Sequence, residues 1–224
     1  MHRRRFLAST ASIAALTAVA GCTGGGESSP SDAPADTDAP SDTPGTGTPG
    51  TGTPEPTPDP DPELSNPGFE EDLRGWDAGE DLPEDPNNEG ATVPADYAPA
   101  TNPSAEGSGS LYIYIDGSAD DGTVWLQQAV DLAPHDTLSV EAYWGDEPSA
   151  NTLSKVAAYA GPFPEGDGGL TESDFDTSKP VEDHEGWRDY EYSVDHDGPG
   201  LVAVGISVVW ETGISRYLDN VRLA

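Results

Sequence analysis

The fold of this chain is decided by the stretch Ser110-Leu111-Tyr112-Ile113-Tyr114-Ile115-Asp116, in which aliphatic side chains occupy every second position. Successive side chains of a β-strand point to opposite faces of the sheet. Leu111, Ile113 and Ile115 therefore share one face, and Tyr112 and Tyr114 share the other. The pattern predicts a strand whose aliphatic face lies in a core and whose tyrosines lie outside it.

Six more short runs are apolar or alternate between apolar and polar residues, and Gly, Pro, Asp and Asn separate them. Helical periodicity is nearly absent. The seven candidate strands cover residues 110–116, 123–132, 137–144, 155–161, 188–194, 201–210 and 216–223. Many short strands joined by turn-forming sequences favour two packed antiparallel sheets. The sequence therefore predicts an all-β sandwich.

The alternation also assigns faces in the second and third of these runs. Inward positions are Leu126, Val130, Leu138, Val140 and Ala142, which leaves Trp125, Gln127, Glu141 and Tyr143 outward. Together with Tyr112 and Tyr114, these outward side chains predict a single sheet face rich in aromatic, amide and carboxylate groups.

The first 21 residues have the pattern of an export signal. Arg3, Arg4 and Arg5 precede Phe6-Leu7 and a small apolar run to Gly21, which is too short to span a bilayer comfortably. An arginine pair followed by Phe-Leu resembles the twin-arginine signal, whose pathway exports folded proteins. Residues 1–21 are therefore interpreted as a cleaved signal peptide.

Cys22 is the only cysteine in the chain and follows Ala18-Val19-Ala20-Gly21. This stretch resembles a lipobox, in which the cysteine thiol receives a diacylglyceryl group and becomes the mature N-terminus. Two acyl chains give stable membrane anchoring. The resemblance implies a protein held at the outer face of the cell membrane, and the alternative is that Cys22 is incidental.

Residues 22–63 form the lipidated cysteine and a linker made almost wholly of Pro, Thr, Ser, Gly, Ala, Asp and Glu. No aliphatic or aromatic side chain larger than alanine occurs between Thr23 and Glu63, so the segment cannot offset its ordering entropy by burial. We expect a disordered tether, which leaves residues 64–224 as one domain large enough to hold its own core.

The formal net charge is −33, from 9 Lys and Arg against 42 Asp and Glu. Such charge strains a compact domain at low salt, but at molar ionic strength the Debye length falls to about 3 Å and the repulsion is screened. The acids are spread along the chain, which indicates adaptation to brine; the alternative is a functional acidic surface. Nucleic acid is excluded as a partner because no basic cluster follows Arg5.

Three motifs of the domain occur in the order of a known family. They are Asn66-Pro67-Gly68-Phe69-Glu70 with Gly75-Trp76 behind it, Gly109-Ser110-Leu111-Tyr112-Ile113, and the closing Tyr217-Leu218-Asp219-Asn220-Val221-Arg222-Leu223. The domain thereby resembles carbohydrate-binding modules of families four and nine, which are galactose-binding-like jelly rolls. The resemblance implies a jelly-roll β-sandwich and a carbohydrate partner, and it implies a core position for Trp76.

The same resemblance implies a structural calcium ion between the first and last strands. Carried over by position, its ligands are Glu70 and Asp219, with Glu106 and the carbonyl of Gly109 as weaker candidates. Calcium takes six to eight oxygen ligands, and such an ion ties the ends of a domain together. The alternative is that the two acids accept hydrogen bonds from backbone amides.

The outward side chains are also the candidate sugar ligands. Pyranose rings pack on Trp and Tyr while amides and carboxylates fix their hydroxyls, and the candidates are Tyr112, Tyr114, Trp125, Gln127, Glu141, Tyr143 and Tyr159. The alternatives are that single aromatics pack in the core or at an edge, or that the face binds other cell-envelope proteins. A third role is a lipoprotein that captures a solute for a transporter. That role is expected to need a two-lobed structure, which one small sandwich does not provide.

An enzyme is not expected, although paired carboxylates leave a glycan-active enzyme open. No Gly-x-Ser-x-Gly elbow is present, and His135, His184 and His196 fall in polar turns without zinc-ligand spacing. The long Pro- and Asp-rich segment 78–107, which includes Tyr97, is predicted to be a loop near the ligand.

Overall fold

The computed structural model describes residues 63–145, 152–166, 168–210 and 212–224. The signal peptide, the lipidated cysteine and the tether predicted for residues 1–62 therefore lie outside the described residues. Among the residues that are described, no helix has the length and apolar character needed to cross a membrane.

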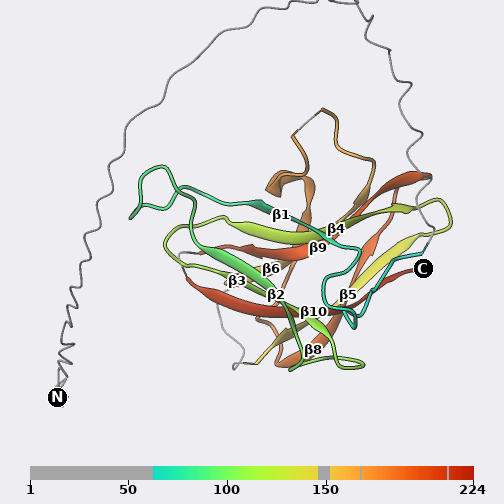
Figure 1. Cartoon of the computed structure of the whole chain (residues 1–224), viewed down its shortest axis with the longest axis horizontal. Coiled ribbons are helices and arrows are strands. Elements are labelled where there is room, and N and C mark those ends of the chain that lie inside the picture. Colours follow the sequence, from blue (N-terminus) through green and yellow to red (C-terminus); the bar gives the residue numbers. More distant parts are fainter. Residues whose placement is uncertain (1–62, 146–151, 167, 211) are drawn as a thin grey trace, which may run out of the picture. The chain divides into compact units, whose positions relative to one another are not determined.

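Ten strands and one short 3-10 helix make up the described part of the chain (Figure 1). The strands are β1 (Asp77–Asp81), β2 (Ala95–Ala100), β3 (Ser110–Ile115), β4 (Thr123–Asp131), β5 (Thr137–Trp144), β6 (Ser154–Gly161), β7 (Asp176–Pro180), β8 (Gly186–Ser193), β9 (Pro199–Val208) and β10 (Ile214–Leu223), and the helix is η1 (Glu172–Asp174). All seven predicted strands are confirmed, each within two residues of its predicted ends.

The strands form two five-stranded antiparallel sheets, with orders β1-β4-β9-β6-β7 and β2-β3-β10-β5-β8. We call them the first sheet and the second sheet. Strands β3 to β6 alternate between the two sheets, and so do β7 to β10, which is the winding of a jelly roll. Figure 1 shows β4 and β9 of the first sheet lying over β10 and β5 of the second. The predicted jelly-roll β-sandwich is confirmed.

Between the sheets lies a core built from the residues that the alternation pointed inward. The side chains of Leu111, Ile113 and Ile115 on β3 are fully buried, as are those of Val130, Leu138, Val140 and Ala142 on β4 and β5, and Leu126 is 1% exposed. Trp76 is also buried and its ring packs 5.6 Å from that of Phe69. The predicted core position of Trp76 is therefore confirmed.

The prediction of a loop over residues 78–107 is wrong. Most of β1 and all of β2 fall in this range, where each adds an edge strand to one sheet. Edge strands bury little, and Val93 is the one buried residue between 78 and 107. Their sequences, DAGED and ADYAPA, therefore carry no apolar alternation that could reveal them. β7, DTSKP, was missed for the same reason.

Candidate functional site

Four aromatic rings form a continuous row across the outer face of the second sheet. Tyr112 on β3 stands opposite Tyr217 on β10, which stands opposite Tyr143 on β5, which stands opposite Trp187 on β8. The ring centroids are 5.3, 6.1 and 5.3 Å apart in that order. We call these four residues the aromatic row.

The row exists because the strand register puts one aromatic residue at the same level of four adjacent strands. Directly opposite residues in antiparallel strands have side chains that meet on one face. Neighbouring rings are tilted by 52° to 77° relative to each other, and the Tyr143–Tyr217 pair is edge-on. All four side chains are half-buried, which leaves part of each ring open to a ligand.

Tyrosine hydroxyls extend the face beside β3. The Tyr112 hydroxyl lies 3.1 Å from the Ser215 hydroxyl, and the Tyr114 hydroxyl donates to Asp116 at 3.2 Å. Burial, followed by the hydrogen bond to Asp116, raises the pKa of Tyr114. The hydroxyl therefore stays neutral; its proton is engaged by Asp116, and its lone pairs remain as acceptors.

A polar row lies next to the aromatic row on the same face. Arg222 donates to Asp189 at 2.6 Å and to Glu141 at 3.4 Å, and the Asn220 amide donates to Glu141 at 3.3 Å. Glu141 and Asp189 are directly opposite each other on β5 and β8. One guanidinium therefore fixes two carboxylates beside the rings.

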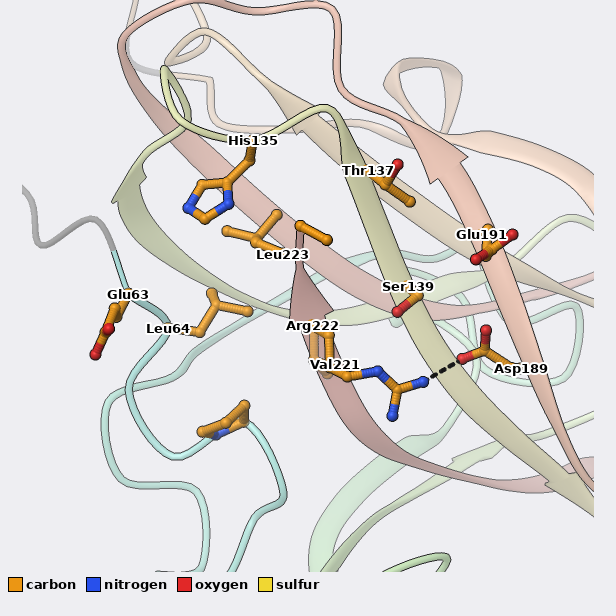
Figure 2. Close-up of a pocket in the computed structure, with 12 residues that line it drawn as sticks. Glu63, Leu64, His135, Thr137, Ser139, Asp189, Glu191, Val221, Arg222 and Leu223 are labelled. Carbon is orange, nitrogen blue, oxygen red and sulfur yellow. Dashed lines mark hydrogen bonds and ion pairs between the residues drawn. The ribbon is translucent and has the colours of Figure 1, made fainter.

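The polar row continues into a cavity of about 580 Å³ (Figure 2). Asp189 and Arg222, joined by their ion pair, line it together with Thr137, Ser139, Glu191 and the segment around Leu64. Since Thr137, Ser139 and Glu191 come from β5 and β8, this cavity opens on the same sheet face as the aromatic row. Rings, fixed charges and a hollow with both polar and apolar walls thus lie on one face of the sheet.

The structure divides the predicted sugar ligands between two faces. Tyr112, Tyr114, Glu141 and Tyr143 lie on the outer face of the second sheet, as expected. Trp125, Gln127 and Tyr159 belong to β4 and β6 of the first sheet, so the prediction of one shared face is wrong for them. The period of two assigns inside and outside, but it cannot say to which sheet a strand belongs.

The prediction that Trp125 is available to a ligand is also wrong. Its side chain is only 3% exposed and packs against Phe175, with ring centroids 5.0 Å apart. The indole N–H donates to Gln127 at 2.8 Å. Trp125 belongs to a second small hydrophobic cluster, with Leu170 and Leu201, that the segment around η1 covers.

Two members of the aromatic row were missed from the sequence. In the sequence Tyr217 stands out only as part of the closing motif, and Trp187 lies just before the predicted strand 188–194. The sequence could have assigned Tyr217 to the outer face, because it precedes Leu218, which points inward. Recognising Trp187 required the pairing of β5 with β8, which sequence spacing does not contain.

The carboxylates predicted to bind calcium accept hydrogen bonds from the backbone. Asp219 accepts from the amides of Asn220, Ala105 and Glu106 at 2.7, 2.8 and 3.2 Å. Glu70 accepts from the amides of Ser108 and Gly109 at 2.8 and 3.0 Å. The Gly109 amide and then Ser108 lower the pKa of Glu70, whereas burial raises that of Asp219.

These donors decide how well the site fits a metal ion. The amide of Glu106 and the amide of Gly109, rather than a carboxylate and a carbonyl, face the two acids. In the described part of the chain, no three His, Cys, Asp or Glu side chains are grouped so that they could hold a metal. Calcium needs six to eight oxygens, and the two carboxylates here already accept from backbone amides, so the residues present do not fit the ion.

Comparison with known proteins finds no matching family model and no matching curated protein. Among solved structures, a carbohydrate-binding module from the β-sandwich superfamily aligns at 13% identity and a TM-score of 0.44, over 73% of this chain and 63% of the other. TmCBM61, solved in complex with β-1,4-galactotriose, aligns at 16% identity and a TM-score of 0.41, over 72% of this chain and 96% of the other. A CBM4 structure aligns at 20% identity and a TM-score of 0.41, over 72% of this chain and 99% of the other. At these values a ligand has to be argued from the chain's own surface.

Proposed function

We propose that this protein is an exported, lipid-anchored module that binds a poly- or oligosaccharide through the aromatic row and has no catalytic role. The observation that carries the proposal is the continuous row of four half-buried rings across β3, β10, β5 and β8. Rings at successive strand positions offer apolar surface to consecutive units of one sugar chain. An isolated exposed aromatic could not do this.

The polar row supports the same function. Sugar hydroxyls need fixed donors and acceptors beside the apolar contact, and Glu141, Asp189 and Arg222 hold one another in place within hydrogen-bonding distance. Because two carboxylates share one guanidinium, the face carries net negative charge. A neutral sugar chain suits it better than an acidic one.

The arrangement of acids supports binding rather than hydrolysis. Glycoside hydrolysis requires a carboxylic acid whose raised pKa lets it donate a proton beside the bond to be cleaved. The pKa is raised, mainly by burial, for Glu172 and Asp219. Glu172 reaches Ser207 on the first sheet, and Asp219 is fully buried beneath three amides. Neither stands beside the row as a free proton donor.

Anchoring and export rest on the sequence of residues 1–22. A Cys22→Ser substitution should release the protein into the medium, because the thiol that would carry the lipid is gone. Replacing the arginine pair Arg4-Arg5 with lysines should instead keep it inside the cell. Cell fractionation separates the two outcomes, and membrane retention of the Cys22→Ser protein would contradict the lipid anchor.

Sugar binding is tested by titrating the purified protein in molar salt with a panel of soluble polysaccharides. For a polysaccharide that binds, Tyr217→Ala and Trp187→Ala should each weaken binding about tenfold or more, as central aromatic contacts do. Tyr97→Ala is the matched control, because Tyr97 is an exposed aromatic on β2 outside the row. Equal loss in the control would contradict a site at the row.

The second candidate function is a structural or adhesive cell-envelope protein. It predicts that no polysaccharide of the panel binds, and that crosslinking from the row captures envelope proteins in a Tyr217-dependent way. The tilt of the rings, up to 77°, favours the sugar, since a flat protein interface would find no flat aromatic patch here.

A further inference from the structure

The cavity beside the polar row lies off the line of the aromatic row. The row crosses the strands at one level, whereas the cavity wall lies further along them. On β5, Ser139 is four residues from Tyr143, and on β8, Glu191 is four residues from Trp187. At about 3.4 Å per residue this is roughly 13 Å along the strands. A sugar chain that lies along the row therefore cannot fill the cavity.

The aromatic row is open at both of its ends. Trp187 lies on β8, which is the edge strand of the second sheet, so no further strand continues the face there. At the other end Tyr112 stands opposite Ala98 of β2, whose side chain is small. A long sugar chain can therefore pass over the row, which suits internal units of the chain rather than its terminus. This leaves the cavity for a group that branches off the chain.

The walls of the cavity have the two kinds of surface that a sugar needs. Leu64 and Leu223 supply apolar contact, and Thr137, Ser139 and Glu191 supply hydroxyl and carboxylate groups (Figure 2). The volume of about 580 Å³ falls within the usual range for sites that hold small ligands. The cavity can therefore hold sugar units beyond those on the rings.

The wall that faces β5 and β10 is held in place by hydrogen bonds. The Ser65 amide donates to the Gln128 side chain at 2.8 Å, and the Gln128 amide group donates back to the Ser65 carbonyl at 3.0 Å. The Val221 amide donates to the Pro67 carbonyl at 3.0 Å. A wall that is already ordered loses little conformational freedom when a ligand binds, which favours affinity.

We propose that the protein recognises a branched glycan, whose main chain lies along the aromatic row and whose side chain lies in this cavity. The inference rests on the proposed sugar-binding function and names its substrate class. On its way the side chain passes the polar row, because Asp189 and Arg222 belong both to that row and to the cavity wall. A linear chain leaves the cavity unused.

The charges of the cavity favour a neutral side chain. Glu63, Asp189 and Glu191 line it, whereas Arg222 is the only lysine or arginine among its lining residues. Like charges that are brought together at a binding site cost affinity. A side chain that ends in a uronic acid should therefore bind more weakly than one made of neutral sugars.

The test is calorimetric titration of the purified full chain, in molar salt, with pairs of glycans that share a backbone. The pairs are cellotetraose and its galactosylated xyloglucan counterpart, a linear mannan and one with mannosyl side chains, and a linear and a branched arabinan. For a backbone that binds, the branched member should bind about tenfold more tightly, as an added hydrogen bond to a charged group allows. Equal affinity within the pairs would overturn the branch and leave the sugar site at the row. No binding by any member would contradict the sugar-binding function itself, and the branch with it.

Substitutions locate the side chain. Glu191→Ala removes an exposed carboxylate of the cavity and keeps the pairing of β8, so it should weaken binding of the branched member about tenfold and leave the linear member unchanged. Glu191→Gln keeps an acceptor oxygen and should recover most of that loss. Glu80→Ala on β1 removes an exposed acid outside the cavity and should change neither. Tyr217→Ala should weaken both members. Unchanged affinity of Glu191→Ala for the branched member would overturn the proposal.

Discussion

Arg216 and Glu182 form an ion pair inside the sandwich, with side chains that are 5% and 1% exposed. Arg216 lies on β10 between the inward residues Ile214 and Leu218, so its alternation places a charge in the core. Its guanidinium also donates to Ser154 at 2.9 Å and lies 5.4 Å from the centre of the Trp144 ring. The pair links the last strand to the connection between β7 and β8.

Breaking this pair should be costly, whereas removing it entirely should not be. Glu182→Gln leaves a buried guanidinium without its counter-charge, and we expect a loss of about 3–5 kcal/mol in the free energy of unfolding. The double variant Arg216→Met, Glu182→Leu should recover most of that loss, since both charges are gone. Urea denaturation of the single and double variants measures the difference. A loss below about 1 kcal/mol in Glu182→Gln would show that the pair is not held as described.

Trp125 should matter for stability and not for sugar binding. Trp125→Ala removes a buried indole from the cluster with Phe175, and we expect a loss of about 3–5 kcal/mol. Gly79 faces the same indole, because a Cβ atom at Gly79 would lie 2.4 Å from it. Gly79→Ala should therefore also destabilise the protein. Thermal unfolding and polysaccharide titration of the two variants check both halves of this prediction. Weakened sugar binding by folded Trp125→Phe would return Trp125 to the ligand site.

The contrast between Trp125 and Tyr143 shows how far the sequence could lead. Both were predicted to point away from the core, and both do so within their own strands. Tyr143 gains two aromatic neighbours, Tyr217 and Trp187, by strand pairing, whereas Trp125 is covered by a distant segment around Phe175. Strand positions and faces follow from local alternation. The sheet to which a strand belongs and the segment that covers it depend on long-range contacts, which is why the alternation placed Tyr112 and Tyr143 on an outer face but could not identify Trp187.

Acid should weaken the protein through His184. Its ring nitrogen lies 2.7 Å from the Tyr190 hydroxyl and its side chain is buried. Burial, then Arg188, lowers its pKa below the ordinary 6.5, against the opposing charges of Asp183 and Glu182. In the window below 6.5 the unfolded chain therefore binds the proton more readily than the folded one. The free energy of unfolding should fall as pH falls through about 6.5 and level off below the folded-state pKa.

Urea denaturation between pH 7.5 and 5 measures this slope for the natural protein and for His184→Gln. The substituted protein should lose the part of the slope that His184 contributes. His196→Gln is the matched control, because His196 lies in a loop and donates only to the Pro199 carbonyl. An unchanged slope in His184→Gln would show that His184 does not titrate on unfolding.

Chelation of calcium should leave the thermal stability unchanged. The backbone amides of Ala105 and Asn220 already occupy the Asp219 carboxylate, and those of Ser108 and Gly109 occupy Glu70. The last strand is tied to the start of the domain by the bond from the Val221 amide to the Pro67 carbonyl instead. Asp219→Ala should therefore cost about 2–4 kcal/mol with or without calcium, by leaving part-buried amides without acceptors. Melting curves with chelator and with added calcium test this, and a rise in melting temperature that depends on Asp219 would establish the ion.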